Sequence, residues 1–129
     1  MNIQLINIQT LHTHESIDMA NVQKVKHQIV KAQCFKEPII VDREHLVVLD
    51  GHHRLKSCQL LGLSKVPCLL VDYLHDKTIR VESRRDNIPI TKRAVITMAL
   101  SGNVFPHKTT RHFIPHRVKQ MRIPLLTLV

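Results

Sequence analysis

Residues 46–56 read LVVLDGHHRLK. An apolar run stops at Asp50 and Gly51, and a helical pattern begins immediately afterwards. When a strand passes directly into a helix, the N–H groups of the first helical turn lack partners within the helix, and the helix dipole favours negative charge there. Two imidazoles and a guanidinium, at residues 52–54, fall in that same turn. The stretch therefore predicts an anion-binding site at the start of a helix.

Each residue of this turn can contribute to such a site. Asp50 can cap the helix or reach a metal ion bound to phosphate, and Gly51 lets the backbone approach a ligand closely. His52, His53 and Arg54 offer donors to a polyphosphate, and an arginine can bind two phosphate oxygens at once. Adjacent helical positions point about 100° apart, so one metal ion is not expected to bind both histidines. A capped helix with a solvated first turn is the structural alternative.

The chain has 129 residues and a formal net charge of +9, which predicts one domain over residues 1–129 with a basic surface. The charge is uneven, because residues 65–129 carry twelve Lys and Arg against four Asp and Glu. Basic surfaces attract nucleic acid, nucleotides or anionic metabolites. With three Phe, one Tyr and no Trp, the chain is poorly equipped to stack single-stranded bases. Nucleotide and duplex DNA remain open as partners.

The three cysteines, Cys34, Cys58 and Cys68, form no C-x-x-C pair and lie in apolar surroundings. They are predicted to be small core residues in a reducing compartment. No apolar run approaches the roughly 20 residues of a membrane span, and residues 1–10 lack a basic leader region. We therefore expect a cytoplasmic protein without a membrane segment.

Hydrophobic patterning predicts a small α+β fold, a mixed sheet with flanking helices. Thr91 is a suitable N-cap for the third helix, and Gly62 suits the end of the second. Residues 105–112 are expected to form a basic loop, and residues 121–129 an apolar tail that packs on the core. The predicted strands cover residues 2–8, 38–41, 46–49, 66–73 and 78–81, and the predicted helices cover residues 16–33, 51–63 and 92–100.

Two further groups of residues have the chemistry of a site. His12-Thr13-His14-Glu15 precedes the first predicted helix, where a carboxylate is favoured electrostatically whatever its function. A functional role for Glu15 requires the first strand to end beside the Asp50 turn, as strand ends at one sheet edge commonly do. Residues 108–112, with Arg117 downstream, offer hydroxyls, cations and an imidazole. This segment can bind phosphate or a zwitterion, or it can be an ordinary basic loop.

Together these groups resemble the ParB/sulfiredoxin superfamily. Asp50-Gly51-His52-His53-Arg54 is similar to the nucleotide-phosphate motif of that fold. Sulfiredoxins carry a catalytic Cys in this motif, where this chain has His52, so thiol chemistry is not expected. The resemblance is closest to the free L-serine kinases, which phosphorylate serine with a nucleotide and Mg²⁺. Three segments match in order: His14-Glu15, the turn at residues 50–54, and Thr110-Arg111-His112.

The resemblance implies a role for each segment. Glu15 would be the general base, Asp50 would reach the metal, and residues 51–54 would bind the nucleotide phosphates. Thr110, Arg111 and His112 would hold the serine. The implied reaction is phosphoryl transfer from ATP or ADP to a small hydroxyl substrate, most simply L-serine. The alternative is a non-catalytic, nucleotide-binding ParB-like regulator or DNA-associated protein, with nucleic acid a possible but less favoured partner.

Overall fold

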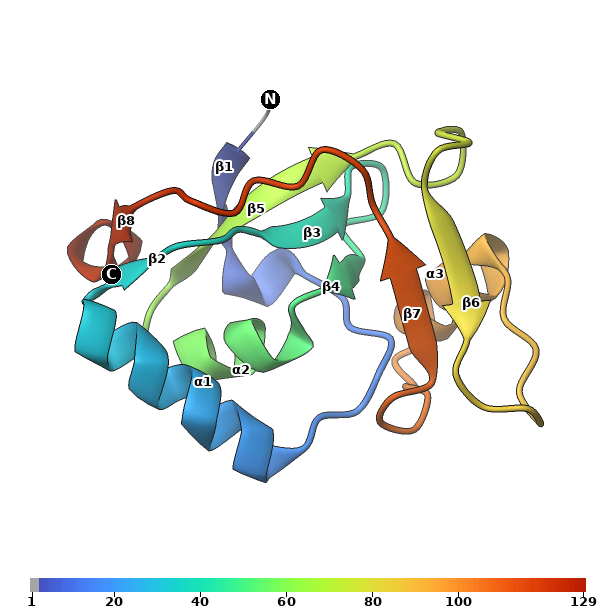
Figure 1. Cartoon of the computed structure of the whole chain (residues 1–129), viewed down its shortest axis with the longest axis horizontal. Helices are drawn as coiled ribbons and strands as arrows, with labels where there is room; N and C mark the ends of the chain where they lie inside the picture. Colours follow the sequence, from blue (N-terminus) through green and yellow to red (C-terminus); the bar gives the residue numbers. More distant parts are fainter. Residues whose placement is uncertain (1–2) are drawn as a thin grey trace.

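The computed structural model describes residues 3–129 and contains a four-stranded sheet (Figure 1). The sheet order is β1–β5–β3–β4, formed by Ile3–Asn7, Lys65–Val71, Ile39–Asp42 and Val48–Asp50. β5 is antiparallel to β1 and parallel to β3, and β4 is antiparallel to β3. The predicted α+β class with a mixed sheet is therefore confirmed.

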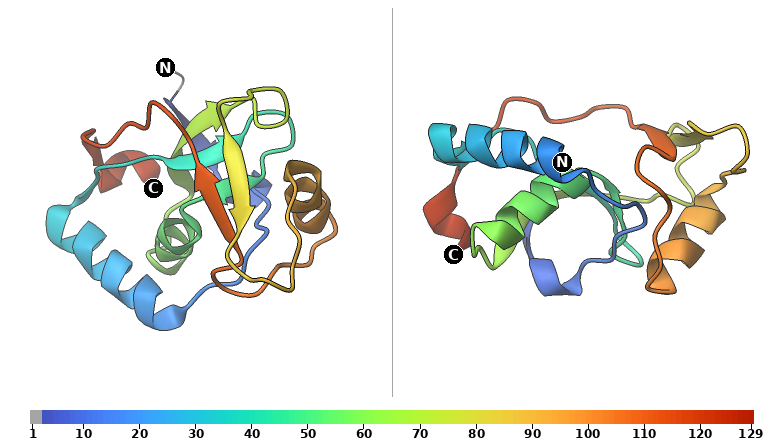
Figure 2. Two further views of the ribbon diagram at one scale, coloured as in Figure 1. Left: turned by 45° about the vertical axis from the view of Figure 1, so that its right-hand side comes forward. Right: turned by 90° about the horizontal axis from the view of Figure 1, so that it is seen from below.

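Both faces of the sheet are covered. Helices α1 (Met19–Ala32) and α2 (His52–Leu60) lie side by side against one face (Figures 1 and 2). Helix α3 (Lys92–Leu100) supplies buried residues to a second core on the other face. Successive residues of β3 alternate between the two cores, because neighbouring strand residues point to opposite faces.

Two short antiparallel ribbons complete the fold. β6 (Arg80–Ser83) pairs with β7 (Thr110–Phe113), and β2 (Cys34–Phe35) pairs with β8 (Ile123–Pro124). Between β7 and β8 the chain runs back across the molecule, as Figure 1 shows in orange and red. Single 3₁₀ turns occupy Ile8–Thr10 (η1) and Leu125–Leu128 (η2). Leu128 is fully buried, so the prediction that the tail packs on the core is confirmed.

The predicted strands are displaced by one or two residues at most of their ends, and three larger differences concern the helices and the basic loop. The first helix begins at Met19 rather than near residue 16, because the side chain of Asp18 caps it. The second helix ends at Leu60, with Gly62 left-handed shortly after it as expected. Residues 105–112 were predicted to be a basic loop, but from Thr110 onward this segment belongs to strand β7. The residues of β7 that face the protein interior are polar. The sequence of this strand therefore lacks the alternating apolar residues from which strands are normally predicted.

The three cysteines are free and buried, as predicted from their apolar surroundings. Among residues 3–129, no helix is both long and apolar enough to cross a membrane.

Candidate functional site

The turn after β4 is shaped by Gly51. This residue is the N-cap of α2 with a φ of 103°, and no side chain caps the helix. The prediction that Asp50 caps α2 is therefore wrong, because the left-handed glycine turns the chain and the Asp50 carboxylate points elsewhere. A Cβ atom at Gly51 would lie 2.5 Å from Cγ2 of Ile39 on β3. Packing against β3 thus requires glycine here, and the first-turn N–H groups of α2 are left without a side-chain cap.

Gly51→Ala is expected to lower the free energy of unfolding by about 2–5 kcal/mol, because it adds steric overlap to an unfavourable left-handed φ. Gly62→Ala is the matched control. Gly62 also has a positive φ, of 72°, but its Cβ would meet no atom within 4 Å. The control should lose only about 1–2 kcal/mol. Urea denaturation of both variants checks the difference, and equal losses would contradict the packing argument.

Asp50 is the centre of a charge cluster. Nη2 of Arg117 donates to its Oδ2 at 2.6 Å, and Nη2 of Arg54 lies 3.5 Å from the same oxygen. Burial alone would raise the pKa of the Asp50 carboxyl, but Arg117 and Arg54 outweigh burial and lower that pKa. Asp50 is therefore a carboxylate at neutral pH, and both recorded contacts use one of its two oxygens.

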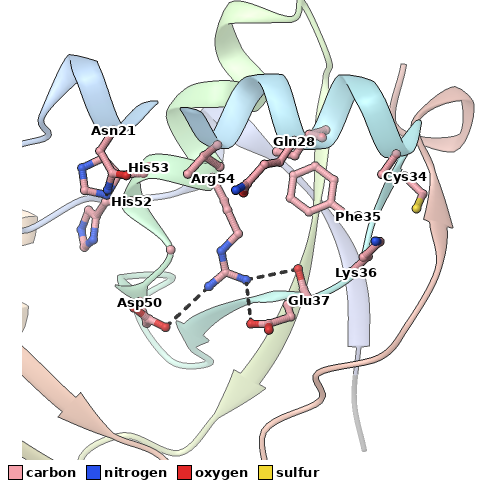
Figure 3. A pocket seen from close by; sticks show the side chains of 14 residues that line it. Asn21, Gln28, Cys34, Phe35, Lys36, Glu37, Asp50, His52, His53 and Arg54 are labelled. Carbon is pink, nitrogen blue, oxygen red and sulfur yellow. Dashed lines mark hydrogen bonds and ion pairs between the residues drawn. The ribbon is translucent and has the colours of Figure 1, made fainter. Parts of the chain in front are cut away.

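The guanidinium of Arg54 is fixed by hydrogen bonds and ion pairs to other residues of the protein. Its Nη1 donates to the carbonyl oxygens of Pro38 at 2.8 Å and Glu37 at 3.3 Å. The same nitrogen lies 3.7 Å from the carboxylate of Glu37. Figure 3 shows the contacts of Arg54 with Glu37 and Asp50. These contacts fix the guanidinium between Asp50 and the segment that precedes β3.

The two histidines of the turn face different neighbours. His52 is 8% exposed, and its Nε2 accepts a hydrogen bond from the backbone N–H of His14 at 3.3 Å. His53 lies nearer the surface, where its Nε2 accepts from the N–H of Asp18, the N-cap of α1, at 3.1 Å. The predicted divergence of adjacent side chains is thus confirmed. Any contact of His52 with a phosphate would come most directly from its backbone N–H, because its ring is turned into the protein.

Glu15 lies within hydrogen-bonding distance of β7. Its Oε1 accepts from the backbone N–H groups of Thr109 and Thr110 at 2.8 and 2.7 Å, and lies 3.1 Å from the Thr110 hydroxyl oxygen. Within residues 3–129, no hydrogen bond is made by the other carboxylate oxygen, Oε2. The carboxylate is therefore anchored through one oxygen, with the second available to a ligand.

The three residues predicted to bind substrate all lie on strand β7, but on its two opposite faces. Thr110 contacts Glu15, and Nε2 of His112 lies 2.8 Å from the hydroxyl of Tyr73. Arg111 points to the opposite face, where its guanidinium stacks 4.9 Å from the Phe113 ring centroid. The structure therefore brings Thr110 and His112 toward the candidate site and turns Arg111 away from it.

Buried imidazoles connect these segments. The ring of His14 is fully buried, with Nδ1 bonded to the carbonyl oxygen of Val48 at 2.8 Å and Nε2 to the Thr110 hydroxyl at 2.9 Å. Its centroid lies 4.6 Å from that of His52 and 5.6 Å from that of His112. Burial lowers the pKa of all three rings, to about 3 for His112. The three rings are therefore neutral at neutral pH and join the first segment to α2 and β7.

Two cavities have one lining residue in common, His52, in the first turn of α2. The larger, of about 580 Å³, runs along α1, from Val25, Ile29 and Phe35 to residues 50–54 (Figure 3). The smaller, of about 350 Å³, is lined by Glu15, Ser16 and Lys56, among others. A cavity with apolar side chains along α1 and β2 and a helix N-terminus at its end suits a ligand with one apolar and one anionic end.

The site also contains two contacts that the sequence did not indicate. Arg117, expected only as a neighbour of the basic segment at residues 108–112, contacts Asp50 across 67 positions of sequence, and Tyr73 contacts His112. No local pattern predicts either contact, because both depend on the path of the chain after β7 and β5. Within the described residues, no group of three or more His, Cys, Asp and Glu side chains is arranged to bind a metal ion.

Comparisons with known proteins were made for sequence and for structure. No protein-family model matches the chain. A ParB-like protein from Sulfolobus acidocaldarius is 34% identical over 71 residues, which cover 55% of this chain and 35% of the relative. An ATP-dependent L-serine kinase from Desulfurococcus mucosus is 30% identical over 73 residues, which cover 54% of this chain and 29% of the relative. The chain thus spans about a third of the length of these curated relatives.

Whole-chain similarity comes from solved structures. A free serine kinase in complex with AMP superposes with a TM-score of 0.86 and 16% sequence identity, covering 98% of this chain and 93% of that one. The fold is that of the free serine kinases. A conserved hypothetical protein from Pyrococcus furiosus has a TM-score of 0.89 at 14% identity, covering 100% of this chain and 98% of that one. The predicted resemblance to ParB-like proteins and L-serine kinases is confirmed.

Proposed function

We propose that this protein transfers a phosphoryl group from ATP or ADP to the hydroxyl of a small substrate, L-serine in the first instance. The observation that carries the proposal is that His52 lines both cavities, which places them next to one another at the start of α2. One cavity ends at an uncapped helix N-terminus, and the other contains the anchored carboxylate of Glu15. Similarity to proteins named ATP-dependent L-serine kinase supports the same activity.

The larger cavity would hold the nucleotide. Its apolar side chains on α1 and β2 would contact the base, and the N–H groups at the start of α2 would bind the phosphates. Asp50 fits a divalent cation, because Mg²⁺ is usually held by one or two carboxylates together with substrate phosphates. Through the free oxygen of Asp50 the ion would be fixed at the turn, where it supplies charge neutralisation for the phosphates.

The smaller cavity would hold the acceptor. Oε2 of Glu15 would accept the proton of the substrate hydroxyl as the oxygen attacks the terminal phosphorus of the donor. Lys56 lines the same cavity and would pair with the carboxylate of an amino acid. Thr110 would act by fixing the Glu15 carboxylate, to which its backbone N–H donates a hydrogen bond. His112 would complete the wall of the site, whereas Arg111 faces away from it.

The proposal is tested by incubating the protein with Mg²⁺, L-serine and either ATP or ADP. We expect O-phosphoserine to form with at least one nucleotide, in equal amount to the nucleotide consumed, as measured by mass spectrometry and ³¹P NMR. D-serine and glycine are the acceptor controls. Nucleotide binding without phosphoserine from either donor would contradict the kinase proposal and favour a nucleotide-binding, ParB-like regulator.

A further inference from the structure

Arg117 is the less constrained of the two guanidinium groups at Asp50. Its Nη2 donates to Asp50, and in the part of the chain that the structure describes its Nη1 and Nε make no hydrogen bond. Arg54, in contrast, donates to two backbone carbonyls and also lies near two carboxylates. An arginine has five N–H donors in a fixed planar arrangement that matches phosphate oxygens. Arg117 can therefore keep its contact with Asp50 and still bind an anion.

The chain conformation directs Arg117 toward the site. His116, the residue before it, is left-handed with a φ of 58°, a conformation that costs a non-glycine residue about 1–2 kcal/mol. Arg117 lies on the segment that crosses the molecule between β7 and β8. Its side chain is only 27% exposed. Such local strain persists where surrounding contacts hold it, and it is concentrated at functional sites.

Arg117 contacts Asp50 but is not among the residues that line the large cavity. Asp50 lines that cavity, whereas Arg117 lines a separate hollow together with His112 of β7. A nucleotide with its base along α1 would extend its phosphates over residues 50–54 and reach Arg117 last. We propose that Arg117 binds the terminal phosphates of the nucleotide donor. This inference rests on the proposed function, since it takes the large cavity as the nucleotide site.

The test is isothermal titration of AMP, ADP and ATP, each with Mg²⁺, into the wild-type chain and Arg117→Gln. Charge-assisted hydrogen bonds of this kind change affinity by about tenfold to a hundredfold. We expect that loss for ADP and ATP, with AMP affected by less than about threefold. Arg117→Lys keeps the charge without the planar donor arrangement and should lie between Arg117→Gln and wild type.

Arg122→Gln is the matched control, because it removes the same charge from the same segment at an exposed position. It should leave all three affinities unchanged. An equal loss for AMP, ADP and ATP in Arg117→Gln would overturn the proposal and indicate a structural role through Asp50. Unchanged affinities for all three would overturn it as well. These binding results do not depend on phosphoserine formation, so the proposed kinase activity can fail while the assignment of Arg117 stands.

Discussion

Glu15→Gln is expected to reduce the rate of phosphoserine formation by about 10²–10⁴-fold, the usual contribution of a general base. Glutamine preserves the size of the side chain and an oxygen that can accept from the N–H groups of Thr109 and Thr110. It removes the carboxylate that would take the proton of the acceptor hydroxyl. The initial rate of phosphoserine formation measures the loss, and titration with ADP should give an affinity within about threefold of wild type.

Glu44→Gln is the matched control for Glu15→Gln. Glu44 is exposed in the turn between β3 and β4, and its replacement removes a carboxylate without altering either cavity. Its rate should equal that of the wild type. A Glu15→Gln variant that folds, binds ADP and turns over at the wild-type rate would contradict the assignment of Glu15 as the base.

Acidification from pH 7.5 to pH 5 is expected to lower the free energy of unfolding by at least about 2 kcal/mol through the buried His112, and further through the buried His14 and His52. In the unfolded chain these rings bind protons near pH 6.5, whereas burial lowers their pKa in the folded protein. Below pH 6.5 the unfolded state therefore binds more protons than the folded state. The free energy of unfolding is at its highest above pH 6.5 and falls as the pH drops below that value. Each ring that stays neutral contributes about 1.4 kcal/mol per pH unit in that range.

Urea unfolding followed by far-ultraviolet circular dichroism at pH 7.5, 6 and 5 measures this dependence. Since small domains are stable by only about 5–15 kcal/mol, a loss of this size is readily measured. His52→Gln should reduce the slope by about 1.4 kcal/mol per pH unit, whatever its effect at pH 7.5. His27→Gln, which replaces an exposed histidine on α1, should leave the slope unchanged. Equal stability at pH 7.5 and pH 5 would contradict the neutral, buried cluster.

The strand, turn and helix at residues 46–60 could be predicted because their determinants are local. An apolar run, a glycine and a helical pattern succeed one another without interruption, and the structure forms β4, Gly51 and α2 in that order. The choice of cap could not be predicted in this way. Aspartate is a common N-cap in general, but here Ile39 on a neighbouring strand requires glycine at the cap position. The carboxylate of Asp50 is thereby left to pair with arginines.

Strand β7 shows why the remainder of the site was harder to predict. Thr110 and His112 face inward, so the polar side chains of this strand lie on the side where apolar ones are expected. They are tolerated there because Glu15, His14 and Tyr73 supply their hydrogen bonds. Because these partners are distant in sequence, the residues around Thr110 and His112, taken alone, predict a basic loop.

The first helix was predicted too long for a similar reason. Residues 16–18 have acceptable helical spacing, but Glu15 forms an isolated bridge with Phe105, and the N–H of Ser16 donates to the Phe105 carbonyl at 2.8 Å. This contact keeps the chain extended until Asp18 caps α1. It also places Glu15 against β7, which is the arrangement that a functional role for this residue requires.

The central claim is that donor and acceptor occupy the two cavities that His52 lines. The most direct measurement is a crystal structure of the protein with ADP, Mg²⁺ and L-serine. The account predicts ADP along α1 with its phosphates at residues 50–54, and serine in the smaller cavity with its hydroxyl beside Oε2 of Glu15. Serine bound on the Arg111 face of β7, or ADP bound outside the larger cavity, would contradict it.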